Sequence, residues 1–221
     1  ELTRRRLAGE PVAYITGAWE FYGLPMKVTP DVLIPRMDTE LLVTTAKELL
    51  LGRKMDARIL DLCCGSGCIA CALGHELPAT KLVAVDISAN ALEIARENFA
   101  SNRLGSRAIC IQADATSSPP MSIGQFDMIV SNPPYIASAE IMTLDSSVRD
   151  YEPIWALDGG EDGYRFYKAI IKYWKSLLRP GGFLLFEVGE GQAATVKDML
   201  SSAGFRAVGS RLDTLNIERV V

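Results

Sequence analysis

The strongest constraint on the fold is a repeated pattern of buried strand, glycine turn and helix. Arg58–Leu62 is a short apolar strand, followed by Gly65, Gly67 and the apolar helix Cys68–Leu77. Lys81–Asp86 is continuously apolar at its centre, as expected of a strand that is buried on both faces. Strands that alternate with helices in this way form a mostly parallel sheet with right-handed crossovers. The sequence therefore predicts an α/β domain.

The pattern continues to the end of the chain. Further helices are predicted from Ser88 to about Ala100, at Tyr164–Leu178 and at Gln192–Ala203. Further strands are predicted at Ala108–Gln112, Phe126–Ser131, Phe183–Val188, Ala207–Leu212 and Ile217–Val221, the last two forming a hairpin with one antiparallel strand. Near the start, Tyr14–Phe21 and Pro25–Val28 are predicted to pair as a β-hairpin that turns at Gly23.

Composition narrows the class of partner. The net charge of −4 and the pI near 5.2 give no basic footprint for a phosphate backbone, so no direct nucleic-acid partner is expected. No apolar run is long enough to span a bilayer, and the residues near Glu1 do not resemble a signal peptide. The sequence leaves the oligomeric state open, with a monomer as the expectation.

Cysteine usage indicates a reducing compartment. Four of the five cysteines, Cys63, Cys64, Cys68 and Cys71, lie in one short stretch. A disulfide framework uses spread-out pairs in a secreted chain, so a cytoplasmic location is predicted. Zinc and iron–sulfur sites usually take ligands from separated loops, and the chain offers only His75 besides this stretch. We therefore expect small buried thiols and no metal.

The turn after the first buried strand is typical of a nucleotide site. Gly65 and Gly67, within Asp61–Gly67, let the backbone approach a ligand where a side chain would clash. Asp86, at the end of the next strand, is placed to accept hydrogen bonds from ribose hydroxyls, and Asp114, after the third strand, from an adenine amino group. A dinucleotide fold shares this layout. Carboxylates that cap a helix or begin a turn are the alternatives for both aspartates.

The segment Asn132-Pro133-Pro134-Tyr135 follows the predicted fourth strand and indicates the chemistry. An amide or aromatic amino nitrogen is planar and weakly nucleophilic, because its lone pair is delocalised. Two acceptors, the Asn132 side-chain oxygen and the Pro133 carbonyl, can hold both N–H groups and localise that lone pair. The two prolines keep the acceptors rigid, and Tyr135 offers a flat face for a planar group. A strand-ending proline turn with a packed tyrosine is the alternative.

Together, these motifs resemble the N-methylating branch of the class I S-adenosylmethionine-dependent methyltransferases. Four further segments are similar to the HemK/PrmC release-factor glutamine methyltransferases: Gly9–Gly17, Glu20–Gly23, Ile34–Glu40 and Tyr151–Gly163. The resemblance covers essentially the whole chain. It implies N5-methylation of the glutamine in the Gly-Gly-Gln loop of class I peptide-chain release factors, with S-adenosylmethionine as cofactor.

The resemblance also implies the architecture. The expected fold is Rossmann-like, with a mostly parallel seven-stranded sheet, a C-terminal antiparallel hairpin strand and a small N-terminal β-hairpin. Residues 1–35 would form a linker helix and the hairpin, and residues 36–221 the methyltransferase domain. The family has a small helical N-terminal domain that helps to dock the protein substrate, and we expect this chain to begin after it.

Roles are carried over to this chain by position. The residues implied to bind the cofactor are Cys63, Cys64, Gly65, Ser66 and Gly67 through their backbone, Asp86 at the ribose, Asp114 and Ala115 at the adenine, and Asn132 beside the methyl donor. The residues implied to hold the glutamine amide are Asn132, Pro133, Pro134 and Tyr135, with Asn132, Pro133 and Tyr135 as the catalytic set. Arg36–Glu40 would help to close the pocket, although a helix start capped by Asp38 explains the same residues.

One departure concerns the glycine turn. The family pattern usually has glycine where Cys63 stands, so a backbone conformation that only glycine adopts easily is in question there. Elsewhere, Trp155 and Trp174 are expected to be packing residues, and His75 a surface residue at a helix end. Glu187 is expected either to shape the pocket or to act as a buried capping carboxylate.

Several other functions fit part of the pattern. An adenine exocyclic amine presents the same planar NH₂ group, so an N6-adenine DNA methyltransferase shares the chemistry, although it needs a segment that holds a flipped base. The candidate segment, Ile136–Asp162, is acidic in balance. A ribosomal-protein glutamine methyltransferase is a closer rival. A silent cofactor-binding module or a dehydrogenase would leave Asn132–Tyr135 without a role.

Overall fold

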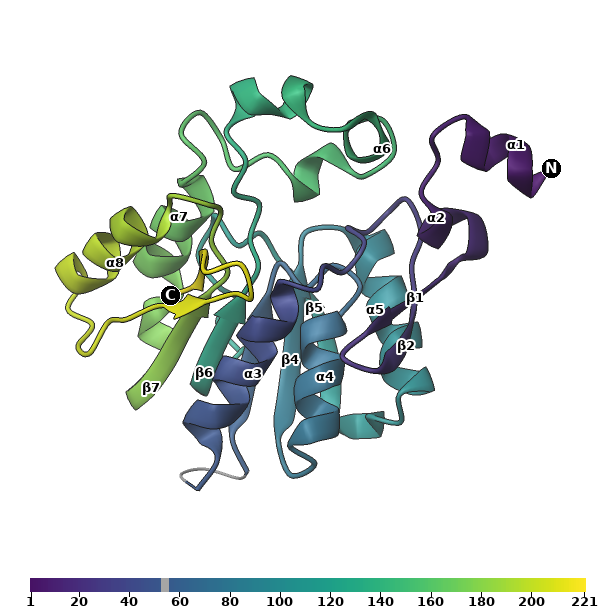
Figure 1. Cartoon of the computed structure of the whole chain (residues 1–221). Coiled ribbons are helices and arrows are strands. Elements are labelled where there is room, and N and C mark those ends of the chain that lie inside the picture. The colour runs from purple at the N-terminus through teal and green to yellow at the C-terminus, as the bar shows by residue number, and fades with distance from the viewer. Residues whose placement is uncertain (53–55) are drawn as a thin grey trace.

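Five parallel strands form the central sheet, in the spatial order β5-β4-β3-β6-β7 (Figure 1). The structure is a computed structural model that describes residues 1–52 and 56–221. The strands are β3 (Arg58–Leu62), β4 (Lys81–Asp86), β5 (Ala108–Gln112), β6 (Phe126–Ser131) and β7 (Leu178–Phe186). Every neighbouring pair is parallel, which confirms the predicted α/β fold.

The predicted count of seven strands in one sheet is not confirmed. In the described part of the chain, β8 (Arg211–Leu212) and β9 (Glu218–Val220) form a separate antiparallel pair. β9 nevertheless lies against the edge of the central sheet through an antiparallel bridge between Glu187 and Val220. Phe186 and Val221 also exchange backbone hydrogen bonds of 2.8 and 2.9 Å. The closing hairpin thus extends the sheet beyond β7 with too few pairings to count as a full strand of it.

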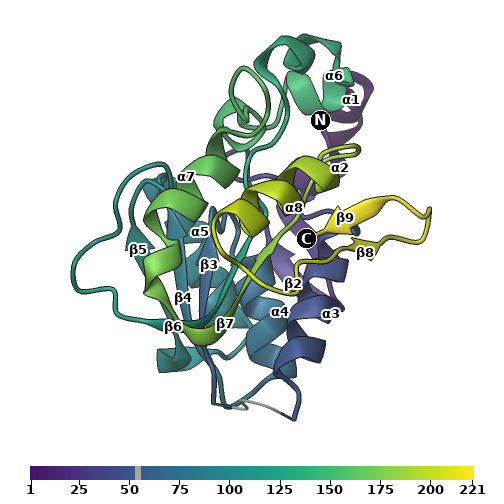
Figure 2. The same ribbon diagram turned by 90° about the vertical axis from the view of Figure 1, so that its left-hand side faces the viewer.

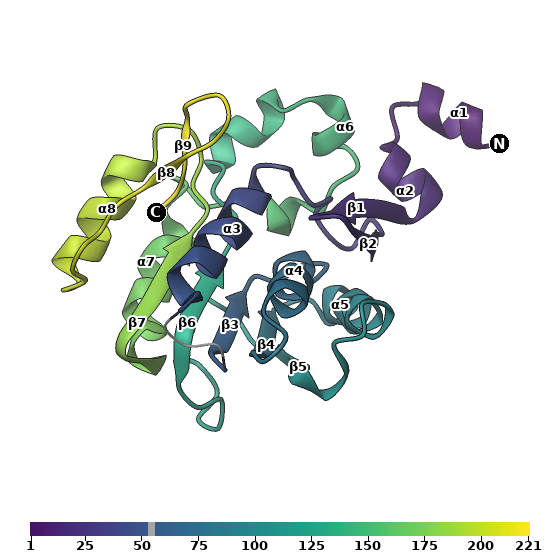
Figure 3. The same ribbon diagram turned by 60° about the horizontal axis from the view of Figure 1, so that its bottom comes forward.

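Helices cover both faces of the sheet (Figures 2 and 3). One face carries α3 (Thr39–Leu50), α4 (Cys68–Glu76) and α5 (Ala89–Ser101), and the other carries α7 (Arg165–Tyr173) and α8 (Ala193–Ser202). Neighbouring residues of β3 alternate between these layers, because Ile59 packs with the first set and Leu60 with the second. The predicted N-cap of α5 is confirmed, since the Ser88 side chain accepts a hydrogen bond from the Ala91 N–H.

The predicted boundary between α7 and β7 was wrong. The helix ends at Tyr173, a 3₁₀ turn η4 (Lys175–Leu177) follows, and β7 begins at Leu178, whereas a helix up to Leu178 and a strand from Phe183 were expected. The Trp174 side chain is fully buried and donates a hydrogen bond to the Ala115 carbonyl, which anchors the end of the helix. The Pro-Gly-Gly segment lies inside β7, where the register with β6 shifts. A bulge therefore accommodates residues that usually break an element.

The N-terminal part consists of α1 (Leu2–Leu7), α2 (Val12–Thr16) and a hairpin of β1 (Ala18–Phe21) and β2 (Leu24–Lys27). The hairpin is confirmed, but its first strand does not begin at Tyr14, which lies in α2. The reason is Gly17, whose left-handed conformation ends α2 just before β1. Tyr14 is buried and donates a hydrogen bond of 2.6 Å to the Val32 carbonyl.

Residues 136–163, hereafter the covering segment, lie above the carboxyl ends of the strands (Figure 1). They contain three short helical turns, η2 (Ser138–Thr143), α6 (Ser146–Arg149) and η3 (Ile154–Ala156). A further 3₁₀ turn, η1 (Gly105–Arg107), precedes β5. Among residues 1–52 and 56–221, no helix is long and apolar enough to cross a membrane.

Asn98 fastens the hairpin to the sheet. This α5 residue is 1% exposed, and its Oδ1 accepts a hydrogen bond of 2.7 Å from the Lys27 N–H. Its Nδ2 donates to the Lys27 carbonyl at 3.0 Å and to the Ser66 carbonyl at 2.9 Å. One amide thus joins the hairpin, α5 and the glycine turn.

We expect Asn98→Ala to lower the free energy of unfolding by about 2–4 kcal/mol, because a buried side chain is lost together with its three hydrogen bonds to the backbone of Lys27 and Ser66. Urea denaturation measures the change. The matched control is Asn90→Ala, at an exposed α5 position with one hydrogen bond to Asp31, which should change stability by less than about 0.5 kcal/mol. Equal effects of the two variants would contradict the role given to Asn98.

Candidate active site

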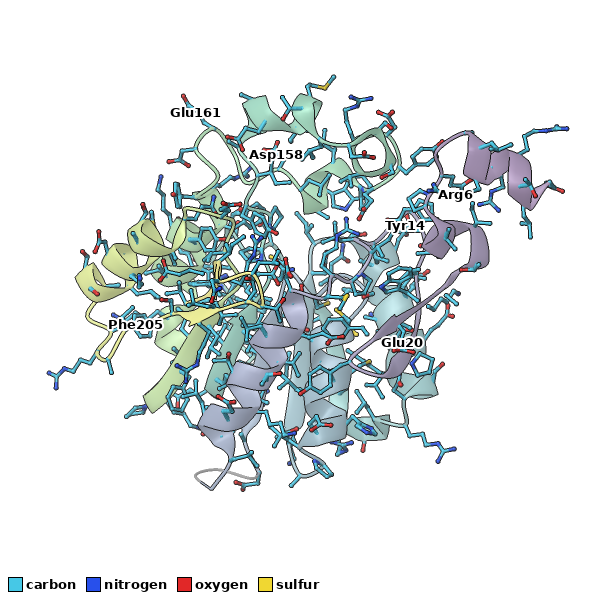
Figure 4. All side chains as sticks on the ribbon, viewed as in Figure 1. Arg6, Tyr14, Glu20, Asp158, Glu161 and Phe205 are labelled. Atoms are coloured by element: carbon cyan, nitrogen blue, oxygen red, sulfur yellow. The ribbon has the colours of Figure 1, made fainter. Side chains whose placement is uncertain are left out.

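A cavity of about 380 Å³ lies at the carboxyl ends of the central strands. The strand order places β3 between β4 and β6, so the chain leaves β3 in one direction and returns on its other side. This is the switch point at which open α/β sheets bind their ligands. The covering segment forms part of the cavity wall. Asp158 of this segment lines the cavity and lies on the lower side of the segment in Figure 4.

Most of the residues predicted from the sequence meet in this cavity. Those that line it are Cys63, Cys64, Gly65, Ser66, Asp86, Asp114, Ala115, Asn132 and Pro134. Three predicted residues are not in its lining: Gly67, Pro133 and Tyr135. Gly67 begins α4, and a Cβ there would lie 2.8 Å from the Phe99 ring, so it serves helix packing. Pro133 is buried, and Tyr135 is half-buried beside it.

The glycine turn brings its backbone to the cavity. Cys63, Gly65 and Gly67 all adopt positive φ angles, of 59°, 51° and 75°. A Cβ built on Gly65 would meet nothing within 4 Å, so this side of the turn is open to a ligand. The Cys64 N–H donates to the Val85 carbonyl at 3.0 Å, which ties the turn to β4. A chain reversal of this kind leaves backbone groups free to contact a bound molecule.

Cys63 does adopt the conformation that glycine favours. A left-handed backbone costs a residue with a Cβ about 1–2 kcal/mol, and the surrounding hydrogen bonds of the turn hold Cys63 there. Burial raises the pKa of the Cys63 and Cys64 thiols well above the usual value, so both are neutral. All five cysteines are free thiols. In the part of the chain that the structure describes, no group of three or more metal-binding side chains is present.

Asp86 joins the glycine turn to α5. Its Oδ2 accepts a hydrogen bond of 2.9 Å from the Gly65 N–H, and its Oδ1 accepts one of 2.9 Å from the Ser88 N–H. Burial raises the pKa of Asp86, and the backbone donors oppose that shift. Each carboxylate oxygen of Asp86 keeps a lone pair that can accept a hydrogen bond from a ligand hydroxyl. The same side chain can therefore bind the ribose, as expected, and also accept a hydrogen bond at the start of a helix, which was the alternative.

Asp114 is held in a turn of its own. Its Oδ1 accepts hydrogen bonds of 2.7 Å from both the N–H and the hydroxyl of Thr116. Burial alone would raise the pKa of Asp114, but these bonds and one from Ser117 outweigh it and lower the pKa. The carboxylate is therefore charged at neutral pH, and it lines the cavity next to the buried Ala115.

Asn132 stands at the end of β6, next to the end of β3. The preceding Ser131 hydroxyl donates to the Leu62 carbonyl at 2.7 Å, which locks the two strand ends together. The Asn132 Nδ2 donates to Thr39 Oγ1 at 3.1 Å, so its Oδ1 is left available as an acceptor. The Tyr135 hydroxyl donates to Glu187 Oε1 at 3.4 Å. Asn132 thus lines the cavity with a free acceptor atom, at the start of a backbone that the two prolines hold rigid.

Comparison with known proteins identifies the family. A sequence profile described as the methyltransferase small domain matches residues 37–146. The chain is 44% identical over its whole length to the release factor glutamine methyltransferase of Geobacter sulfurreducens, of which it covers 75%. It is 46% identical over 90% of its length to that of Bradyrhizobium diazoefficiens, of which it covers 67%.

The chain belongs to the release factor glutamine methyltransferase family. Solved structures support the fold. The catalytic domain of hMettl16, in complex with an RNA hairpin, superimposes with a TM-score of 0.71 at 20% identity, covering 90% of this chain and 74% of that one. The ribosomal protein L11 methylase of Lactobacillus delbrueckii superimposes with a TM-score of 0.61 at 19% identity, covering 88% and 83%. At these identities, the likeness concerns the fold alone.

S-adenosylmethionine is the cofactor that membership in this methyltransferase family implies, and the cavity fits it. The open side of Gly65 leaves room for a ligand at the turn. Asp86 offers acceptors suited to two ribose hydroxyls, and the lining is mostly apolar around a few polar groups, as in other cofactor pockets.

Sequence reasoning missed part of the site and misplaced one residue. Trp155 was expected to be a packing residue, but it lies in η3, is 53% exposed and lines the cavity from the covering segment. His75 is exposed and Trp174 is buried, as expected. Glu187, 2% exposed, is a buried carboxyl behind Tyr135. Thr39 was not singled out at all, although it is the partner of Asn132.

The Ile34–Glu40 segment closes one side of the cavity, where Pro35, Arg36 and Thr39 line it. Arg36 forms an ion pair with Glu152 of the covering segment, and the other Glu152 oxygen accepts a hydrogen bond of 3.1 Å from the Ile34 N–H. The alternative explanation for this segment is incomplete, because Asp38 precedes α3 without making a side-chain capping bond.

We expect Asp86→Ala to weaken the binding of S-adenosylmethionine roughly 10- to 100-fold, because charge-assisted hydrogen bonds to the ribose are lost. Isothermal titration calorimetry measures the affinity, and circular dichroism checks the fold. Asp198→Asn, an exposed position on α8, is the control and should bind normally. Unchanged affinity in the Asp86 variant would rule out the ribose role.

A second expectation concerns Asp61, at the end of β3. It is fully buried, its Oδ2 accepts a hydrogen bond of 3.2 Å from the Ala70 N–H, and its Oδ1 has no hydrogen-bond partner among the described residues. Burial raises the pKa of Asp61 from 3.8 to about 8. The stability that this proton provides is present below pH 3.8 and is lost as the pH rises towards 8.

The free energy of unfolding of wild type should therefore fall relative to that of Asp61→Asn as the pH rises from 4 to 8, by up to about 1.4 kcal/mol per pH unit. Urea denaturation at several pH values measures the difference. Asp198→Asn should show none of this pH dependence. A difference between wild type and the Asp61 variant that is constant with pH would show that Asp61 is ionised in the native state.

Proposed function

We propose that this protein transfers a methyl group from S-adenosylmethionine to the side-chain amide nitrogen, N5, of the glutamine in the Gly-Gly-Gln motif of class I peptide-chain release factors. The observation that carries the proposal is the segment Asn132-Pro133-Pro134-Tyr135, of which Asn132 and Pro134 line the switch-point cavity, in a chain 44% identical to a release factor glutamine methyltransferase. The relatives' names support the choice of substrate, and the geometry of the site supports the choice of chemistry.

The acceptor atoms of Asn132 and Pro133 activate the substrate nitrogen. The Asn132 Oδ1 and the Pro133 carbonyl accept the two N–H groups of the glutamine amide, which draws the nitrogen from planar towards tetrahedral geometry. The lone pair is then localised and directed at the methyl group. S-adenosylmethionine supplies that methyl as an electrophile on a sulfonium. The Asn132 amide is already bound to Thr39, so it is positioned before the substrate arrives.

Tyr135 and Pro134 bind the amide by its faces rather than by proton transfer. Burial raises the pKa of Tyr135 far above its usual value, so the phenol is neutral at any physiological pH. A neutral phenol does not act as a base, and its ring is a stacking surface. The extra proton leaves after methyl transfer, once the nitrogen has become more acidic, so strong base catalysis is not required.

The proposal also divides the chain into two parts. Residues 1–35 form the linker helix and β-hairpin, and residues 36–221 the methyltransferase domain. The hairpin is fastened to the domain by the hydrogen bonds between Asn98 and the Lys27 backbone, which supports a fixed rather than a mobile appendage. We place the protein in the cytoplasm, where release factors act, as a monomer without direct nucleic-acid contacts.

The test uses radiolabelled S-adenosylmethionine with three acceptors: a class I release factor, its Gln→Ala loop variant and duplex DNA. Labelling of the wild-type release factor alone supports the proposal. Label in DNA would move the function to adenine methylation, and label in the Gln→Ala variant would move it to another side chain. Binding of the cofactor without transfer to any acceptor would indicate a silent module.

In the same assay, Asn132→Ala should lower kcat roughly 10²–10³-fold, the loss typical of one group that stabilises a developing charge. Cofactor affinity should fall much less, because the turn and Asp86 remain. Asn90→Ala, exposed on α5, serves as the control with normal kcat. A kcat within a few-fold of wild type in the Asn132 variant would contradict the proposed activation of the amide.

A further inference from the structure

A polar cluster lies directly behind the proposed acceptor pair. Thr39, the first residue of α3, is 2% exposed, and Glu187, the residue after β7, is also 2% exposed. Thr39 Oγ1 accepts from Asn132 Nδ2 at 3.1 Å, and Glu187 Oε1 accepts from the Tyr135 hydroxyl at 3.4 Å. Three elements of the fold, α3, β6 and β7, thus meet at two residues of the Asn-Pro-Pro-Tyr segment.

The direction of the hydrogen bonds in this cluster is fixed by chemistry. Because the Thr39 oxygen accepts from Asn132, the Thr39 hydroxyl hydrogen must point elsewhere. The Glu187 carboxyl is the neighbouring acceptor, and the Thr39 hydroxyl lies close enough to stabilise its charged form, although Oε2 has no partner with full hydrogen-bond geometry among the described residues. In its charged form the Glu187 carboxyl only accepts, so it can take the Thr39 hydrogen but cannot donate one to Thr39.

The groups around Glu187 have opposite effects on its pKa. Burial raises the pKa of Glu187 to about 7, while the Thr39 and Tyr135 hydroxyls lower it; Asp38 raises it and Arg219 lowers it. The Glu187 backbone N–H also donates to the Ser131 carbonyl at 3.0 Å, so the carboxyl is held at the strand end beside Asn132. A buried carboxyl with an unpartnered oxygen destabilises the fold, so its presence at this strand end calls for a functional reason.

We propose that Thr39 and Glu187 are positioning residues that fix which way the Asn132 amide faces. Thr39 Oγ1 accepts from Asn132 Nδ2, which leaves the Asn132 Oδ1 to face the substrate. In the proposed arrangement the charged Glu187 takes the Thr39 hydrogen and so keeps Thr39 an acceptor towards Asn132. The reversed amide would present two N–H donors to the substrate N–H groups and repel them. This inference rests on the proposed function, because it concerns the activation of a planar NH₂ group.

The first test is Thr39→Val, which keeps the shape of the side chain and removes the hydroxyl. We expect kcat to fall roughly 10- to 100-fold, the loss of a hydrogen bond in a charged network, while the KM for the release factor and the Kd for S-adenosylmethionine stay within about threefold. Thr39→Ser restores the hydroxyl and should recover most of the lost kcat. The control is Thr45→Val, a buried threonine of the same helix away from the cavity.

The second test is Glu187→Gln, which keeps the size of the side chain and removes the charge. The glutamine NH₂ group can donate to Thr39, which turns the Thr39 hydrogen towards Asn132 and reverses the Asn132 amide. We expect a kcat loss of the same order as in Thr39→Val. In an Asn132→Ala background, neither substitution should cost more than about threefold further, because the group that they position is absent.

Two results overturn the proposal: a kcat within about threefold of wild type in both variants, or a loss that persists undiminished in the Asn132→Ala background. The proposal would also be overturned if the loss of kcat were matched by a weaker cofactor Kd or a lower thermal stability, because Thr39 and Glu187 would then have only a structural role. The kcat of each variant is compared with that of wild type on whichever acceptor the wild-type enzyme methylates. A failure of the release-factor assignment can therefore be told apart from a failure of this inference.

A third measurement needs no acceptor at all. Solvent exchange of the Asn132 side-chain amide protons, followed by NMR, should be at least roughly tenfold faster in Thr39→Val than in wild type or Thr45→Val, because the bond to Oγ1 is lost. Equal exchange rates in all three proteins would show that Thr39 does not hold the Asn132 amide, whatever the enzyme methylates.

Discussion

Parallel pairing of β3 with β6 brings the two halves of the site together. Leu62 pairs with Ser131, 69 positions later, and the Ser131 hydroxyl donates to the Leu62 carbonyl. The residues that follow, Cys63 and Asn132, therefore leave the sheet side by side and in the same direction. The glycine turn and the proline segment can meet over one cavity only because both strands end at this edge. A slip in the β3–β6 register would separate the cofactor turn from the acceptor pair.

Buried carboxyl groups lie around this edge of the sheet. They lower the stability of the fold, and they hold the residues of the site in position. Asp61 and Glu187 each have a buried oxygen without a hydrogen-bond partner among the described residues, and burial raises both of their pKa values. Glu152 is buried as well, but it is paired with Arg36 and the Ile34 backbone. Such groups weaken a core. Their concentration around Asn132 and the glycine turn is consistent with a site that is held rigid before its ligands bind.

The fold and the site could be predicted from the sequence where a residue type has a single physical explanation at its position. Strands that alternate with helices predicted the parallel sheet, and Gly65 with Gly67 predicted the turn. Asp86, predicted to lie at the end of its strand and beside this turn, is the last residue of β4 and accepts from the Gly65 N–H. The β7 boundary was missed because a bulge absorbed Pro180 and its two glycines. Tyr14 was assigned to a strand because Gly17 was not recognised as the end of a short helix. Glu187 was expected to shape the pocket or to be a buried capping carboxylate, and it is buried. Thr39 was not singled out, since only the folded sheet brings it to Asn132.

The account is tested most directly by locating the transferred methyl group. The protein would be incubated with S-adenosylmethionine and a class I release factor, and the product digested and sequenced by tandem mass spectrometry. We predict one added methyl on the side chain of the glutamine in the Gly-Gly-Gln motif, formed at an initial rate roughly 10²–10³-fold lower when Asn132→Ala replaces wild type. A methyl on any other residue, or an equal initial rate with the Asn132 variant, would contradict the claim that this segment activates the glutamine amide.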